Sequence, residues 1–242
     1  MRLYDLKFMF DVIAFDADDT LWHNENIYRD TQSRVVEILA QYHDTDWIER
    51  RIYETEIRNI EHYGYGFKGF TLSMIETAIE LTEGRISGTE IGQMIEITRE
   101  MMKSPIVLLD GVAETLAQLS AEHELMLITK GDLFEQEAKI IRSGLADHFR
   151  KIEVVKTKTP ETYLTLAARH QFDPQRFLMI GNSLKSDILP VLAIGGRAVY
   201  IPYETTWAHE IVPEADLIGK EFIELTHIKE VPELIERLKS TN

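Results

Sequence analysis

The sequence contains no cysteine, which excludes a disulfide framework and any thiolate metal site. It has no apolar run close to the ~20 residues that a membrane-spanning helix needs. It also has no cluster of lysine and arginine that would form the basic face of a nucleic-acid binder. The N-terminal segment MRLYDLKFMFDVIAFD carries acids within its apolar part and no small-residue cleavage site, so a signal peptide is not expected. From these absences we expect a cytoplasmic protein that binds neither membranes nor nucleic acids.

The residues that are present have the composition of a soluble globular protein, with 44% hydrophobic and 28% charged residues. A length of 242 residues fits one large domain, or a core domain that carries an insert. The formal net charge of −15 favours solubility but repels anionic ligands at long range. An anionic substrate would therefore need a local positive pocket or a metal ion.

Hydrophobic residues between positions 27 and 102 recur at the spacing of amphipathic helices, so this block is predicted to be all-helical. Elsewhere, short apolar runs alternate with helical patterns. Strands are predicted at residues 11–16, 124–129, 151–155, 177–181, 197–202 and 215–219. Helices are predicted at residues 111–120, 134–144, 160–170, 187–196 and 231–240.

Strands that alternate with helices of this length are typical of a parallel sheet covered on both faces. The expected fold is therefore α/β, a Rossmann-like parallel-sheet core with an inserted α-helical domain. The core would comprise residues 1–22 and 105–242, and the helical domain residues 23–104. Sheets of this kind bind ligands beyond the carboxyl ends of their strands, so the chemistry is expected at that edge.

Polar residues directly after the predicted strands are the candidates for this chemistry. The stretch VIAFDADDTLW places Asp16, Asp18 and Asp19 within four residues after a buried strand. Unpaired carboxylates so close together would be costly to bury, so a positive charge is expected beside them. Asp19 is interpreted as a turn residue. The ends of the other strands contribute Thr129, Lys130, Lys156, Lys158, Asn182 and Asp187.

This set of side chains fits phosphoryl transfer, which needs a nucleophile, charge neutralisation and in-line positioning. An aspartate such as Asp16 can be the nucleophile and form an aspartyl-phosphate. Asp18 lies two residues on, on the same side of an extended chain, where it can protonate the leaving alkoxide and later activate water. Mg²⁺ prefers oxygen ligands and can be held by one or two carboxylates. A magnesium ion would therefore explain how the acids tolerate one another.

The same residues resemble those of the haloacid dehalogenase (HAD) superfamily of phosphatases. The resemblance is carried by DADDT, a threonine at a strand end, a downstream lysine and GNSLKSD, over residues 8–23 and about 105–220. The helical block lies where that superfamily has its C1-type cap. The resemblance implies that Asp16 is the nucleophile and a Mg²⁺ ligand. It also implies that Asp18 is the general acid and base, with its backbone carbonyl as a second ligand.

By the same resemblance, Thr129 would bind the phosphoryl oxygens, a lysine would balance the charge of Asp16, and Asp187 would complete or buttress the Mg²⁺ site. Three positions depart from the family pattern. Asn182 stands where the family usually has aspartate, so the metal would bind with one fewer charge. Lys130 stands where asparagine is frequent in the family, so an extra cation is expected to face the site.

The third departure is KTKTP in place of Lys-Pro-x-Pro. Thr159 and Pro160 have the pattern of a helix N-cap and first helical residue. This pattern places Lys158 just before a helix and favours it over Lys156 as the charge-balancing lysine.

The leading hypothesis is thus a Mg²⁺-dependent phosphatase that acts on a small phosphorylated metabolite. A 2-haloacid dehalogenase is the nearest alternative, but its chemistry has no alkoxide to protonate and so no use for Asp18. A phosphomutase would use the same aspartates. A binding or regulatory protein with a weakened site is favoured only by Asn182.

Three other sequence features have more than one interpretation. GYGFKG at residues 64–69 matches a dinucleotide-binding pattern, but it follows a helix and not a strand, so that function is rejected. The loop from Tyr63 to Phe70 either touches the substrate or is a plain interhelical loop. Trp207 and His209 either line the rim of the site or serve packing.

Overall fold

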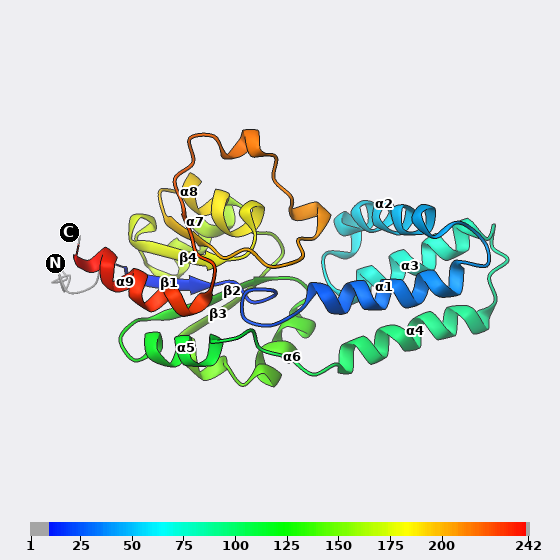
Figure 1. Ribbon diagram of the computed structural model, residues 1–242, viewed down its shortest axis with the longest axis horizontal. Helices are drawn as coiled ribbons and strands as arrows, with labels where there is room; N and C mark the ends of the chain where they lie inside the picture. Colours follow the sequence, from blue (N-terminus) through cyan, green and yellow to red (C-terminus); the bar gives the residue numbers. More distant parts are fainter. Residues whose placement is uncertain (1–9, 241–242) are drawn as a thin grey trace.

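The computed structural model describes residues 10–240, and the N-terminal residues 1–9 discussed above lie outside this range. The molecule is elongated, with an α/β core at one end and a bundle of helices at the other (Figure 1). The core contains a parallel sheet of order β3-β2-β1-β4-β5-β6. Its strands are β1 (Val12–Phe15), β2 (Leu125–Lys130), β3 (Lys151–Val155), β4 (Phe177–Gly181), β5 (Arg197–Tyr200) and β6 (Ile223–Glu224). The predicted fold class is confirmed.

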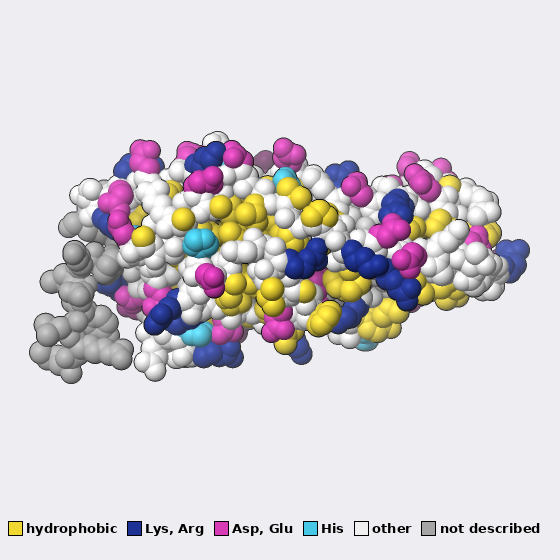
Figure 2. Space-filling view, turned by 90° about the horizontal axis from the view of Figure 1, so that it is seen from below, with side chains coloured by type: hydrophobic (Ala, Val, Ile, Leu, Met, Phe, Trp, Pro, Cys, Tyr) yellow, Lys and Arg dark blue, Asp and Glu magenta, His cyan; other side chains and the backbone are white. Residues whose placement is uncertain are grey.

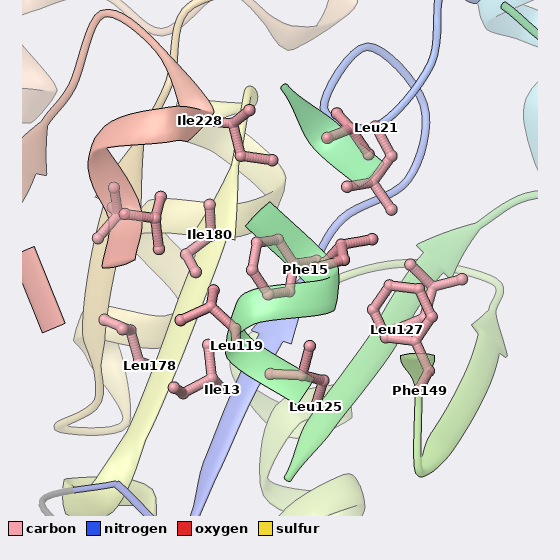
Figure 3. Packing of buried hydrophobic residues seen from close by; sticks show 14 of the residues in the cluster. Ile13, Phe15, Leu21, Leu119, Leu125, Leu127, Phe149, Leu178, Ile180 and Ile228 are labelled. Atoms are coloured by element: carbon pink, nitrogen blue, oxygen red, sulfur yellow. The ribbon is translucent and has the colours of Figure 1, made fainter. Parts of the chain in front are cut away.

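Both faces of the sheet are covered, which explains why its strands are continuous apolar runs. Side chains alternate along each strand, so Ile13 and Phe15 point to one face while Val12 and Ala14 point to the other. Figure 3 shows the packing on the first of these faces. That face is covered by α5 (Val112–Ser120), α6 (Leu133–Ser143) and α9 (Val231–Ser240), and the second by α7 (Pro160–His170) and α8 (Leu189–Ala193).

One predicted strand is wrong. Residues Glu214–Leu217 form a 3₁₀ turn, and the edge strand is β6, which pairs with Val199 and Tyr200. The apolar run lies at the surface, where Ile218 is 81% exposed. Pro213 fixes the backbone φ at the residue where the turn begins. A strand of two residues such as β6 is too short to show a period of two in the sequence.

The helical block between β1 and β2 is a cap of four helices, as predicted. They are α1 (Glu25–Leu39), α2 (Thr45–Tyr63), α3 (Phe67–Leu81) and α4 (Gly88–Lys103). The cap has its own apolar core, in which Val35, Leu39, Ile52, Met74 and Met94 are fully buried. The loop expected over residues 63–70 is shorter, because α3 already begins at Phe67.

The two chain segments that join cap and core lie side by side. The backbone N–H of His23 donates to the carbonyl of Val107 (3.0 Å), and that of Leu109 to the carbonyl of Leu21 (3.0 Å). The boundaries at residues 22/23 and 104/105 stay a prediction. Within residues 10–240, no helix is long and apolar enough to span a bilayer. Figure 2 shows acidic, basic and hydrophobic side chains interspersed on one face of the molecule.

A buried acid of α6 holds the cap against the core. The carboxylate of Glu135 accepts hydrogen bonds from the Tyr28 hydroxyl (3.1 Å) and from the backbone N–H of Phe67 (3.0 Å), both of which belong to the cap. Lys139, one turn further along α6, forms an ion pair with it (3.2 Å). Glu135 is only 2% exposed, so these three groups replace the water that a carboxylate would otherwise bind.

Glu135→Ala is expected to lower the free energy of unfolding by about 3 kcal/mol, because it leaves two polar cap groups without their partner and removes one of the two carboxylates that contact a buried lysine. Urea denaturation measures this loss, and amide hydrogen exchange should become faster at the start of α3. The control is Glu137→Ala, which removes an exposed carboxylate from the same helix. Equal effects of the two substitutions would show that Glu135 does not join the two domains.

Candidate active site

A cavity lies between the carboxyl ends of the strands and the cap. Its core wall comes from the ends of β1, β2 and β4, and its cap wall from α1, α2 and α3. We call it the site cavity. The structure brings all but one of the sequence-predicted candidates to it, namely Asp16, Asp18, Thr129, Lys130, Lys158, Asn182 and Asp187. Lys156 is exposed and does not line the cavity.

Lys158 lies between two carboxylates at the floor of the cavity. Its Nζ donates to Oδ1 of Asp16 and to Oδ1 of Asp187 (2.7 Å), and its side chain is 1% exposed. The hydroxyl of Thr159 accepts from the backbone N–H of Thr162 (3.3 Å) and so caps α7, which fixes the position of Lys158. The local sequence thus places Lys158, and not Lys156, beside Asp16.

One lysine does not balance two buried carboxylates. Burial raises the pKa of Asp16 to about 7, with Asp187 adding to the rise, although Lys158 opposes it. Burial alone would lower the pKa of Lys158, but Asp16 and Asp187 outweigh it and raise that pKa. The floor of the cavity therefore carries an excess of negative charge, which a further cation would offset.

The oxygen atoms around Asp16 fit a hard cation such as Mg²⁺. The single hydroxyl hydrogen of Thr20 is within reach of both Oδ2 of Asp16 (3.1 Å) and Oδ1 of Asn182 (3.2 Å), so acceptors outnumber donors. Asp187 accepts from Lys158 and from the backbone N–H of Ser183 (3.0 Å), which suits a buttressing role. A donor set of carboxylate and amide oxygens with no sulfur is the one that Mg²⁺ prefers.

Asp18 is held by groups that the sequence did not reveal. Its carboxylate accepts from Trp22 Nε1 (2.7 Å), Gln136 Nε2 (2.8 Å) and Lys139 Nζ (2.9 Å). Burial alone would raise the pKa of Asp18, but Lys139 and these hydrogen bonds outweigh it and lower the pKa. Asp18 is therefore ionised and directed toward α6. Gln136 and Lys139 belong to no motif, and only the polar face of an amphipathic helix marks them in the sequence.

Asp19 has the turn role that was predicted for it. Its φ of 61° is in the left-handed region. Its carboxylate accepts from the backbone N–H groups of Asn24 (2.8 Å) and Glu25 (3.0 Å), at the start of α1. Asp19 thereby connects the end of β1 to the first helix of the cap.

Lys130 faces a carboxylate that the sequence analysis missed. Its Nζ donates to Oε1 of Glu210, while Oε2 of Glu210 accepts from the hydroxyls of Ser183 and Ser186. Burial alone would raise the pKa of Glu210, but Lys130 and the two serines outweigh it and lower the pKa to about 2. Trp207, which the sequence placed either at the rim of the site or in packing, lines the cavity. Glu210 lies three residues further on and also lines the cavity, but it belongs to no sequence motif.

The cap wall carries two acids that form no ion pair among residues 10–240. Glu25 and Glu56 line the cavity, and the side chain of Glu56 has no hydrogen bond or ion pair among residues 10–240. Burial raises the pKa of Glu56 from its usual 4.5 to about 7. Burial, with Asp19 and Glu56 nearby, raises the pKa of Glu25 to about 8.

We expect Glu56→Gln to raise the melting temperature by about 3 °C at pH 8 and by little at pH 5. The folded protein disfavours the charged form of Glu56, so its destabilising effect builds up as the pH rises from 4.5 to about 7 and is complete above that. Thermal unfolding at the two pH values tests this, with Glu61→Gln, an exposed acid of the same helix, as control. The same gain at pH 5 and pH 8 would contradict it.

Comparisons with known proteins agree with this geometry. A sequence profile described as haloacid dehalogenase-like hydrolase matches residues 10–195. The glyceraldehyde 3-phosphate phosphatase of Pyrococcus furiosus is 25% identical over 238 residues, which cover 96% of this chain and 94% of that protein. The structure of a haloacid dehalogenase-like family hydrolase from Xanthomonas campestris is 41% identical, with a TM-score of 0.85, and covers 96% of this chain and 93% of that one.

A 2-haloacid dehalogenase from Pseudomonas syringae pv. Tomato also superimposes, with a TM-score of 0.61 at 19% identity, over 95% of this chain and 99% of that one. At such identity the likeness shows the fold alone. The profile match and the 41% identical structure both extend over most of the chain, so they carry the assignment that the strand-end motifs predicted. The chain belongs to the haloacid dehalogenase-like hydrolase family.

Proposed function

We propose that this protein is a Mg²⁺-dependent phosphatase that hydrolyses a small phosphorylated metabolite through an aspartyl-phosphate. The observation that carries the proposal is the placement of Asp16 against Lys158, with Asp18 two residues on in the same cavity. A carboxylate nucleophile, a charge-balancing lysine and a second carboxyl group are the parts that this reaction needs. A cytoplasmic location stays a prediction from the sequence.

In the first step, a carboxylate oxygen of Asp16 forms a bond to phosphorus while the bond from phosphorus to the alkoxide oxygen breaks. Asp18 gives its proton to that alkoxide. In the second step, water attacks the phosphorus of the aspartyl-phosphate, Asp18 takes the proton from the water, and Asp16 is released with inorganic phosphate. The Thr129 hydroxyl has no hydrogen-bond partner among residues 10–240, so it is available to the phosphoryl oxygens, as is Lys158.

A magnesium ion would be held by Asp16, Asn182 and the backbone carbonyl of Asp18, and would offset the negative charge of Asp16 and the phosphoryl group. Asp18 must acquire a proton before the first step, although Lys139 lowers its pKa. That proton would come from solvent water before the first turnover and from the attacking water of the preceding cycle afterwards, once Asp18 has left Lys139 for the oxygen of the leaving group.

A small substrate fits the architecture, because the cap covers the nucleophile and excludes bulky phosphoproteins. The relative from Pyrococcus furiosus is a phosphatase whose name specifies a three-carbon phosphate. The fold is shared with a 2-haloacid dehalogenase. The position of Asp18 argues against that chemistry here, since loss of a halide needs no proton donor.

Purified protein is expected to hydrolyse p-nitrophenyl phosphate in Mg²⁺ and to stop when EDTA removes the metal. Asp16→Asn should lower kcat by at least about a thousandfold, because the amide cannot replace the nucleophile. Asp46→Asn, which changes an exposed aspartate of the cap in the same way, is the control. Release of halide from a 2-haloacid, without turnover of any phosphate ester, would identify a dehalogenase instead.

Mg²⁺ should stabilise the wild-type protein and so raise its melting temperature. At a concentration one hundred times Kd, the expected gain in the free energy of unfolding is about 2.7 kcal/mol. Without metal the pKa of Asp16 is about 7, so the ion must displace a proton below that pH. Calorimetry should therefore show tighter Mg²⁺ binding at pH 8 than at pH 6. Below pH 7, Kd should rise about tenfold for each pH unit. Asp16→Asn should abolish this pH dependence, and unchanged affinity in that variant would place the metal elsewhere.

A further inference from the structure

The carboxylate of Glu210 occupies a set of donors that the proposed reaction does not use. Oε1 accepts from Lys130 Nζ, and Oε2 accepts from the hydroxyls of Ser183 and Ser186, the latter at 2.7 Å. We call Lys130, Ser183 and Ser186 the carboxylate cradle. All three line the site cavity together with the proposed nucleophile.

The cradle is held in place by contacts that do not involve Glu210. Lys130 Nζ also donates to Ser186 Oγ (3.1 Å) and lies over the ring of Tyr65, 4.8 Å from its centroid. The backbone N–H of Ser186 donates to Ser183 Oγ (3.0 Å), and the hydroxyl of Tyr163 donates to the Ser186 carbonyl (3.1 Å). These contacts fix the donors before any ligand arrives, which lowers the entropy cost of binding a carboxylate.

The cradle lies a short chain of contacts away from the nucleophile. The backbone N–H of Ser183 donates to Asp187 (3.0 Å), and Asp187 accepts from Lys158, which also contacts Asp16. A molecule with its phosphoryl group at Asp16 and a carboxylate a few bonds away can therefore reach both places within the same cavity.

The single charge of Lys130 balances one carboxylate at a time, so a second one can enter only if Glu210 leaves. Glu210 lies on a 3₁₀ turn, Ala208–Glu210, in the connection between β5 and β6. Residues 202–210 of this connection are partly or fully exposed and belong to no strand. A connection of this kind can shift at lower cost than a strand or a packed helix.

We propose that the cradle binds a carboxylate on the leaving group of the substrate, and that Glu210 occupies the cradle when no substrate is bound. The substrates would then be short phosphorylated carboxylic acids. The inference rests on the proposed phosphatase function and adds to it the chemical class of the leaving group.

The test compares 3-phosphoglycerate with glycerol 3-phosphate, which has a hydroxymethyl group where the first compound has a carboxylate. The readout is the ratio of kcat/KM for the acid to kcat/KM for the alcohol. Glu210→Gln is expected to raise this ratio about tenfold, because it removes the internal competitor and leaves Lys130 without its counter-charge. Lys130→Met should lower the ratio about tenfold, and Ser186→Ala should lower it less.

Two further variants make the test specific. In the double variant Lys130→Met/Glu210→Gln, the gain from Glu210→Gln should vanish, because its cause is the freed lysine. Lys156→Met removes an equal charge from an exposed position outside the cavity and should leave the ratio as it is in the wild type. A shift in Lys156→Met as large as in Lys130→Met would assign the effect to the general field and overturn the cradle.

If Glu210→Gln and Lys130→Met lower kcat/KM for both compounds by the same factor, Glu210 serves only to position Lys130, and the cradle is wrong. If the wild-type enzyme hydrolyses neither compound nor p-nitrophenyl phosphate, the phosphatase function itself is wrong. Calorimetry in the Asp16→Asn background then still compares the affinities for the two compounds. An acid that binds no more tightly than the alcohol, with and without Glu210→Gln, overturns the cradle on its own.

Discussion

The pairing of Lys158 with two buried carboxylates is the interaction on which the rest of the site depends. It joins the end of β1, the start of α7 and the π-helical turn Leu184–Ile188 after β4, three separate segments of the sequence. Two negative charges and one positive charge leave an excess of one negative charge, which burial makes costly. That imbalance contributes to the raised pKa of Asp16, and it is the charge that the proposed magnesium ion would offset.

Two further lysines of the site are each paired with another carboxylate, so they do not relieve this imbalance. Asp18 is balanced by Lys139, and Glu210 by Lys130. Lys139 also contacts Glu135, which receives the hydrogen bonds from the cap. The proposed acid and the joint between the domains thus share one lysine, so a movement of the cap changes the electrostatic environment of Asp18.

Site residues that directly follow a strand or directly precede a helix could be predicted from the sequence. Asp16, Asp187 and Lys158 each follow or precede a regular element, and the edge of a parallel sheet brings such positions together. Glu210 and Lys139 could not be predicted, because a loop and a helix face place them and the partner of each is known only from the packing. The same reason explains β6, whose two residues become a strand only because Tyr200 lies beside them.

Asn182 is best understood through the charge of the loaded site. The charges of Asp16, Asp187 and Lys158 sum to −1, and the proposed magnesium ion would change that sum to +1. A phosphoryl group with two negative charges then gives −1, whereas an aspartate at position 182 would give −2. A neutral amide holds the metal with less attraction, but it leaves the loaded site more attractive to a dianion. A protein with a net charge of −15 repels anions at long range, so the weaker hold on the metal would be offset by better capture of the proposed phosphorylated substrate.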